Sequence, residues 1–149
     1  RDWRSRGSLT GEPCRVTSLP VGIKMLNLRY RPFWIAASAV LVLVVVWGSL
    51  QTALSGEVPQ GFDKVEHFGT YLFLAVWFTG LIARKRWWMV AATLLILGAA
   101  MEAGQYMMQA GRTADVYDMA ANTAGIAAGL LLAALLTGGW AQRIESWLR

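Results

Sequence analysis

An uninterrupted apolar run near the start of the chain constrains the fold more than any other feature. Residues 33–50 contain no charged side chain and include the run VLVLVVVW. A helix here has no polar stripe at the helical period, which a surface helix of a soluble bundle would need. The run is typical of a transmembrane helix, since about 17–25 residues cross a hydrocarbon core about 30 Å thick.

The composition also favours a membrane protein. The chain has 149 residues, of which 56% are hydrophobic and 15% charged, whereas soluble domains carry about 25% charged residues. The single Cys14 excludes an internal disulfide, and the single His67 excludes motifs with two histidine ligands. At this length we expect one membrane domain.

Three more apolar segments follow, at residues 68–83, 87–108 and 118–136. Together the four segments predict an all-α, multi-pass integral membrane protein with four transmembrane helices.

A short amphipathic stretch ends the chain. Trp140, Ile144, Trp147 and Leu148 recur at helical spacing, and Arg143 lies on the other side. This pattern predicts a short C-terminal helix that lies at the membrane interface and anchors the chain.

The basic residues indicate the orientation of the four helices. Of the 14 Lys and Arg residues, all except Lys64 and Arg112 fall on one side of the predicted arrangement. The positive-inside rule then places both termini in the cytoplasm. The net charge of +5 is thus explained by topology, so we expect the lipid bilayer as a partner and no nucleic acid.

Residues 1–24 are polar and show neither helical nor strand periodicity. Met25 is followed by a short stretch with Arg29 and Arg31 and then by the first apolar run, so two interpretations remain open. Residues 1–24 lie upstream of a true start at Met25, or they form a cytoplasmic tail. In both cases the predicted membrane domain comprises residues 25–149.

Polar side chains gather at the outer ends of the second, third and fourth predicted helices. One stripe of each helix carries them, with Asp63 and His67 on the second, Glu102 and Gln105 on the third, and Asp118 and Asn122 on the fourth. Lys64 and Arg112 belong to the same outer side. We therefore expect them to meet in one site.

Glu102 is the most informative of these residues. At a rise of about 1.5 Å per residue it lies about 22 Å above Trp87, so about 8 Å inside the outer boundary of the hydrocarbon core. An ionisable group at mid-membrane costs roughly 2.5–3.5 kcal/mol and less towards the edge. Glu102 is therefore expected to face inward, either paired or protonated.

Structural roles explain part of the same pattern. Asp63 with Glu66, and Asp115 with Asp118, fit helix N-capping. The spacing of Gly125 and Gly129 predicts close packing of the fourth helix against a neighbour.

Three motifs in order carry a resemblance to the VanZ-like membrane protein family. They are DKxxH at Asp63–His67, ExxQ at Glu102–Gln105, and Arg112-x5-Asp118-x3-Asn122-x2-Gly125-x3-Gly129. The resemblance covers roughly residues 62–136. The family is bacterial and is named for a member linked to low-level resistance to the glycopeptide teicoplanin, while most members have no assigned activity. It implies a multi-pass protein of the bacterial cytoplasmic (inner) membrane.

Two functional hypotheses follow. In the first, the outward-facing site binds or modifies an envelope component, such as a lipid-linked cell-wall intermediate, and affects glycopeptide susceptibility. A partly desolvated carboxyl group suits a general acid or base. The candidate catalytic residues are Glu102, His67 and Asp118, and the candidate substrate-binding residues are Asp63, Lys64, Gln105, Arg112 and Asn122.

In the alternative hypothesis the protein is not catalytic. It binds a lipid or drug or assists another membrane protein, and its polar cluster is a lock between helices. Whether the protein is an enzyme stays open at this point. A divalent cation held by Asp63, His67, Asp118 and Glu102 is a further option, and this oxygen-rich set favours magnesium or manganese over zinc.

Overall fold

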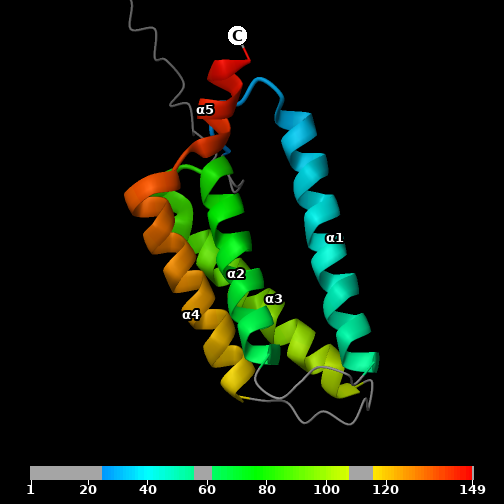
Figure 1. Cartoon of the computed structure of the whole chain (residues 1–149). Coiled ribbons are helices and arrows are strands. Elements are labelled where there is room, and N and C mark those ends of the chain that lie inside the picture. The colour runs from blue at the N-terminus through cyan, green and yellow to red at the C-terminus, as the bar shows by residue number, and fades with distance from the viewer. Residues whose placement is uncertain (1–24, 56–61, 108–115, 149) are drawn as a thin grey trace, which may run out of the picture.

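The computed structural model describes residues 25–55, 62–107 and 116–148, which are almost entirely helical (Figure 1). The elements in chain order are α1 (Arg31–Ser55), α2 (Phe62–Leu81), the 3₁₀ turn η1 (Arg84–Arg86), α3 (Trp87–Met107), α4 (Val116–Leu132), the π turn η2 (Ala133–Thr137) and α5 (Trp140–Trp147). No strand occurs in these residues, in which an isolated antiparallel bridge joins Met25 to Ile82. The predicted all-α class is confirmed, and the calls on residues 1–24 lie outside the described part.

Each predicted apolar segment forms a helix, but the four helices differ in polarity. Three stretches are long and apolar enough to cross a membrane, namely Arg31–Gln51, Arg84–Met107 and Val116–Trp147. Helix α2 is not among them, because its first two turns contain Asp63, Lys64, Glu66 and His67. The structure therefore supports a membrane protein with three clear candidate spans.

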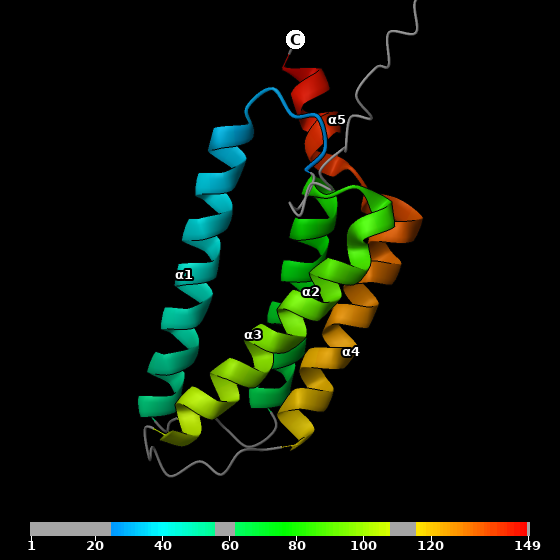
Figure 2. The same ribbon diagram turned by 180° about the vertical axis from the view of Figure 1, so that it is seen from behind.

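Helix α2 lies at the centre of the bundle and packs closely along α4, while α1 stands on the other side (Figures 1 and 2). Two glycines of α4 permit this close approach. A Cβ atom at Gly125 would overlap the carbonyl oxygen of Phe68, and one at Gly129 would lie 2.6 Å from the carbonyl oxygen of Leu72. Any side chain at these positions would push the two helices apart.

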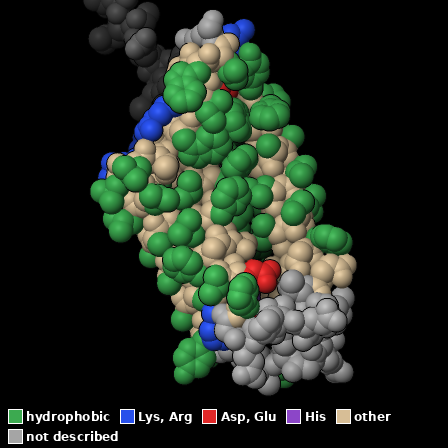
Figure 3. Space-filling model, viewed as in Figure 1, with side chains coloured by type: hydrophobic (Ala, Val, Ile, Leu, Met, Phe, Trp, Pro, Cys, Tyr) green, Lys and Arg blue, Asp and Glu red, His purple; other side chains and the backbone are tan. Residues whose placement is uncertain are grey.

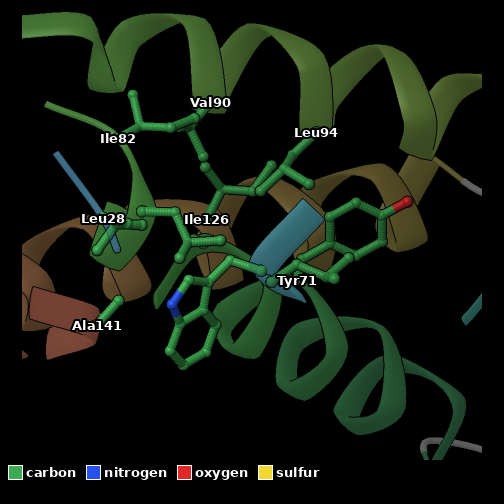
Figure 4. Packing of buried hydrophobic residues seen from close by; sticks show 11 residues of the cluster. Leu28, Tyr71, Ile82, Val90, Leu94, Ile126 and Ala141 are labelled. Carbon is green, nitrogen blue, oxygen red and sulfur yellow. The ribbon is translucent and has the colours of Figure 1, made fainter. Parts of the chain in front are cut away.

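Tryptophans join α1, α2 and α5 at one end of the molecule. The ring centroids of Trp34 and Trp140 are 5.3 Å apart, and those of Trp77 and Trp140 are 5.1 Å apart. The Trp140 indole donates a hydrogen bond to the carbonyl oxygen of Val76 and covers Gly80. Buried aliphatic side chains continue this core towards α3 and α4 (Figure 4).

Helix α5 makes more specific contacts with the bundle than an anchor on the membrane surface requires. The helical conformation is interrupted before α5 at Gly139, whose φ of 72° favours glycine. Ala141 and Glu145 are buried against the protein, while Trp147 and Leu148 stay exposed. The predicted C-terminal helix is therefore present, but one of its faces docks on α1 and α2.

Glu145 caps the N-terminus of α1. Its carboxylate accepts hydrogen bonds from the backbone N–H groups of Arg29 and Tyr30 at 2.7 and 2.9 Å, and from the Trp34 indole at 2.9 Å. The first N–H groups near a helix start have no intrahelical acceptor, and negative charge is favourable there. The last turns of the chain thus fix the start of the first helix.

The two ends of the bundle differ in charge, and large apolar side chains are exposed along its flank (Figure 3). We call the end that carries η1 and α5 the basic end, since Arg84, Lys85, Arg86 and Arg143 lie there. We call the opposite end, where α2 and α4 begin and α3 finishes, the acidic end.

Candidate functional site

The acidic end brings side chains from three helices together. The first two turns of α2 supply Asp63, Lys64 and His67, and the first two turns of α4 supply Asp118 and Asn122. Near its C-terminal end, α3 supplies Glu102 and Gln105. Asp63 and Asp118 lie within the first helical turn, where a carboxylate also interacts favourably with the helix dipole.

His67 is at the centre of this cluster. Its Nδ1 atom lies 3.1 Å from Oδ1 of Asn122. Its Nε2 atom lies 3.7 Å from the carboxylate of Asp63 and 4.0 Å from those of Glu102 and Asp118. In the tautomer that carries its proton on Nδ1, His67 donates a hydrogen bond to the Asn122 oxygen, and Nε2 then faces the carboxylates with its lone pair.

A second link joins α2 to α4. The Lys64 ammonium lies 3.3 Å from Oδ1 of Asp118 and 5.9 Å from the centre of the Tyr117 ring. Lys64 thus partly neutralises the carboxylate that faces His67.

The residues from α3 and α4 are buried, while Asp63, Lys64 and His67 of α2 are partly exposed. The exposed fractions are 8% for Glu102, 4% for Asp118 and 1% for Asn122. The Nδ2 atom of Asn122 has no hydrogen-bond partner among the described residues, and it lies where a Cβ atom at Gly98 would approach it to 3.0 Å. A buried donor of this kind is costly unless it serves a ligand or a water molecule.

Gln105 connects the site to α1. Its side-chain amide donates a hydrogen bond of 3.0 Å to the backbone carbonyl of Ser49. Gln105, Ser49 and His67 line the same small cavity, whose volume of about 10 Å³ is close to what one water molecule needs. A larger ligand requires the helix ends to separate or must bind above this cavity.

Two residues of this cavity were missed by the sequence analysis, Ser49 and Tyr71. Tyr71 follows His67 by four positions, so the helical period could have placed it on the same face. Ser49 gave no such signal, because its position depends on how α1 packs against the other helices.

Three side chains of the cluster could hold a cation. One ligand atom each from Asp63, His67 and Asp118 lies within 4.8 Å of the other two. Two carboxylates and one imidazole suit magnesium or manganese better than a thiol-rich set would. The expected fourth ligand, Glu102, contacts His67 but is not in this set.

One predicted site residue, Arg112, lies outside the described residues. The other seven polar candidates converge as described above. Gly125 and Gly129 lie on the α4 face that contacts α2, next to the cluster and not within it.

Comparison with protein families identifies the family of the chain. The family model for VanZ/LLP1 matches residues 15–137. The chain belongs to the VanZ/LLP1 family. The match begins well before Phe62, so family similarity extends through α1 and further towards the N-terminus than the three motifs indicated. Comparison of this VanZ/LLP1 protein with curated proteins and with solved structures gives no significant match.

Proposed function

We propose that this VanZ/LLP1 protein is a bacterial inner-membrane protein that binds and modifies an envelope component at its acidic end. The component we favour is the head group of a lipid-linked cell-wall intermediate in the outer leaflet. The observation that carries the proposal is the meeting of His67 with carboxylates from α2, α3 and α4.

The energetic argument concerns Glu102. A carboxyl group in the hydrocarbon region is expensive, while a hydrogen bond between membrane helices contributes only about 0.6 kcal/mol on average. A purely structural lock could use uncharged residues at much lower cost. The presence of Glu102 beside His67 therefore favours a chemical role over a purely structural one.

In the proposed reaction, a water molecule attacks the head group, His67 takes a proton from that water, and Glu102 gives a proton to the oxygen of the bond that breaks. Asn122 holds the Nδ1 proton of His67, so that Nε2 faces the reacting groups. Asp63 and Asp118 stabilise the imidazolium that forms. Lys64, with Arg112, attracts a phosphate group, and Gln105 and Asn122 orient a sugar or an amide.

The proposed topology has four transmembrane helices with both termini in the cytoplasm. Helix α2 has 20 residues, which at about 1.5 Å per residue span about 30 Å. In its first two turns, Lys64 and His67 contact α3 and α4, while Glu66 is exposed and is placed at the membrane interface. The basic end then faces the cytoplasm, in agreement with the positive-inside rule.

The test compares a carboxylate of the cluster with an exposed residue at the same end of the bundle. Membranes containing the wild-type protein, Glu102→Gln or Thr123→Ala are supplied with lipid-linked cell-wall intermediates, and the products are measured by mass spectrometry. We expect a protein-dependent mass change that Glu102→Gln abolishes and Thr123→Ala retains, since Thr123 is exposed and donates its hydroxyl hydrogen bond to Met119 of its own helix. Equal products from Glu102→Gln and the wild type would contradict the catalytic role.

The second candidate function is a non-catalytic one, in which the cluster is a lock between helices. The His67–Asn122 and Lys64–Asp118 contacts favour it, since both join α2 to α4. In that case His67→Ala would unfold the protein in detergent at a clearly lower temperature, whereas the catalytic hypothesis predicts loss of product with a small change in Tm.

A further inference from the structure

A second pocket lies at the basic end of the bundle, at the opposite end from the His67 cluster. Its volume is about 350 Å³. The end of α2, the turn η1, the π turn η2 and the first turn of α5 all contribute to its walls. The residues that matter for its chemistry are Arg84, Trp87, Leu135, Leu136, Gln142 and Arg143.

The guanidinium group of Arg143 is held in place at this pocket. It donates hydrogen bonds to the carbonyl oxygens of Leu136 and Gly138 at 3.1 and 3.0 Å. The helix ends at these residues, so the two carbonyl groups need partners from outside it. A guanidinium has more N–H donors than two carbonyl oxygens use, so donors are left for a ligand.

The second guanidinium is positioned by an aromatic ring. Arg84 lies 5.5 Å from the centre of the Trp87 ring, and the Trp87 indole is itself fixed by a hydrogen bond to the carbonyl oxygen of Ile82. Among the described residues that line the pocket, none is acidic. Two ordered guanidinium groups therefore face the pocket with no carboxylate in its walls to neutralise them.

The surroundings of the pocket suit an amphiphilic ligand. Leu135 and Leu136 belong to its lining and are 70% and 66% exposed, so they face the acyl chains of a surrounding bilayer. A ligand with an anionic head and apolar tails could place its head against the arginines and its tails along these leucines. Paired guanidinium groups suit the oxygens of a phosphate group.

We propose that this pocket binds the phosphate group of an anionic phospholipid in the leaflet at the basic end. Basic pockets between membrane helices are suited to such head groups. The site is independent of the proposed function, since it lies at the other end of the bundle and requires no reaction.

The experiment measures lipids bound to the purified full chain by native mass spectrometry. Phosphatidylglycerol and phosphatidylcholine are offered in equal amounts to the wild type, Arg84→Ala, Arg84→Ala/Arg143→Ala, and the control Arg29→Ala/Lys85→Ala. The control removes the same charge from the basic end, because Arg29 and Lys85 are exposed and do not line the pocket.

We expect the wild type to prefer phosphatidylglycerol. The pocket double variant is expected to lose about tenfold in apparent affinity, as loss of charge-assisted hydrogen bonds implies, while the control stays within about twofold. Arg84→Ala leaves the Arg143–carbonyl contacts intact, so a partial loss in this variant supports the proposal even where the double variant does not fold.

Two results would overturn it. An equal loss in the pocket variants and the control would mean diffuse attraction by the basic end. Displacement of the lipid by glycerol phosphate at equal concentration would mean that the pocket takes a soluble phosphate ester and does not depend on the acyl chains.

Discussion

His67 shows how much of the chemistry of this chain depends on single residues. Its two ring nitrogens have different surroundings, since Asn122 contacts one and carboxylates lie around the other. The convergence could be predicted, because Asp63, His67, Glu102 and Asn122 each fall on the polar stripe of a helix. Which residue contacts each ring nitrogen could not be predicted, since these contacts depend on the rotation of each helix about its axis.

Asn122→Ala tests whether Asn122 positions His67 for the reaction or stabilises the fold. It removes the acceptor at Nδ1 of His67 but leaves Glu102 in place, so we expect at least tenfold less product and a loss of only about 0.6 kcal/mol in unfolding free energy. Thermal unfolding in detergent, run beside the product assay, checks both. A loss of several kcal/mol with unchanged product would favour the lock.

Glu145→Ala tests a residue that the sequence analysis did not single out. The change leaves the backbone N–H groups of Arg29 and Tyr30 and the buried Trp34 indole without their acceptor. An unsatisfied buried donor costs about 1–3 kcal/mol, so we expect at least that loss in unfolding free energy. Ser146→Ala, on the exposed side of α5, is the control, and an equal effect of both changes would contradict the capping role.

At the scale of elements, the helices were more predictable than their contacts. Apolar runs of membrane length predicted α1, α3 and α4, and the amphipathic period predicted α5. That α5 docks on α1 could not be predicted, because a buried Glu145 and an exposed Trp147 reverse what polarity alone suggests. The Trp34–Trp77–Trp140 contacts decide this arrangement.

Gly125→Ala tests the close packing of α2 and α4. The new methyl group would overlap the carbonyl oxygen of Phe68, so we expect a loss of about 1–3 kcal/mol in unfolding free energy. Gly104→Ala is the matched control, because no atom lies within 4 Å of a Cβ atom there. Its stability should stay the same or rise by up to about 1 kcal/mol. Equal destabilisation of the two variants would contradict the packing argument.

For the whole molecule, the sequence predicted a membrane protein from its scarcity of charge, and the three clear candidate spans agree with this. The uneven placement of charge could also be predicted, because basic residues cluster between helices and in the tail. The proposed span of α2 could not be predicted from hydropathy, since it depends on the contacts that Lys64 and His67 make with α3 and α4.

Cysteine labelling tests the proposed topology. In a Cys14→Ser background, Val116→Cys places a thiol at the exposed start of α4, and Lys85→Cys places one in η1. We expect a membrane-impermeant maleimide to label Val116→Cys in intact cells and Lys85→Cys only after the membrane is opened. Labelling of both in intact cells, or the reverse pattern, would be incompatible with four spans and cytoplasmic termini.

The most direct test of the proposed role of the His67 cluster is the affinity of the purified protein for a lipid-linked cell-wall intermediate. We predict that His67→Ala weakens this binding at least tenfold and that Thr123→Ala, at an exposed position of α4, changes it by less than about twofold. The folded fraction of both variants is expected to equal that of the wild type. Equal affinity of all three proteins, or no measurable binding by the wild type, would contradict the claim that the acidic end is a binding site.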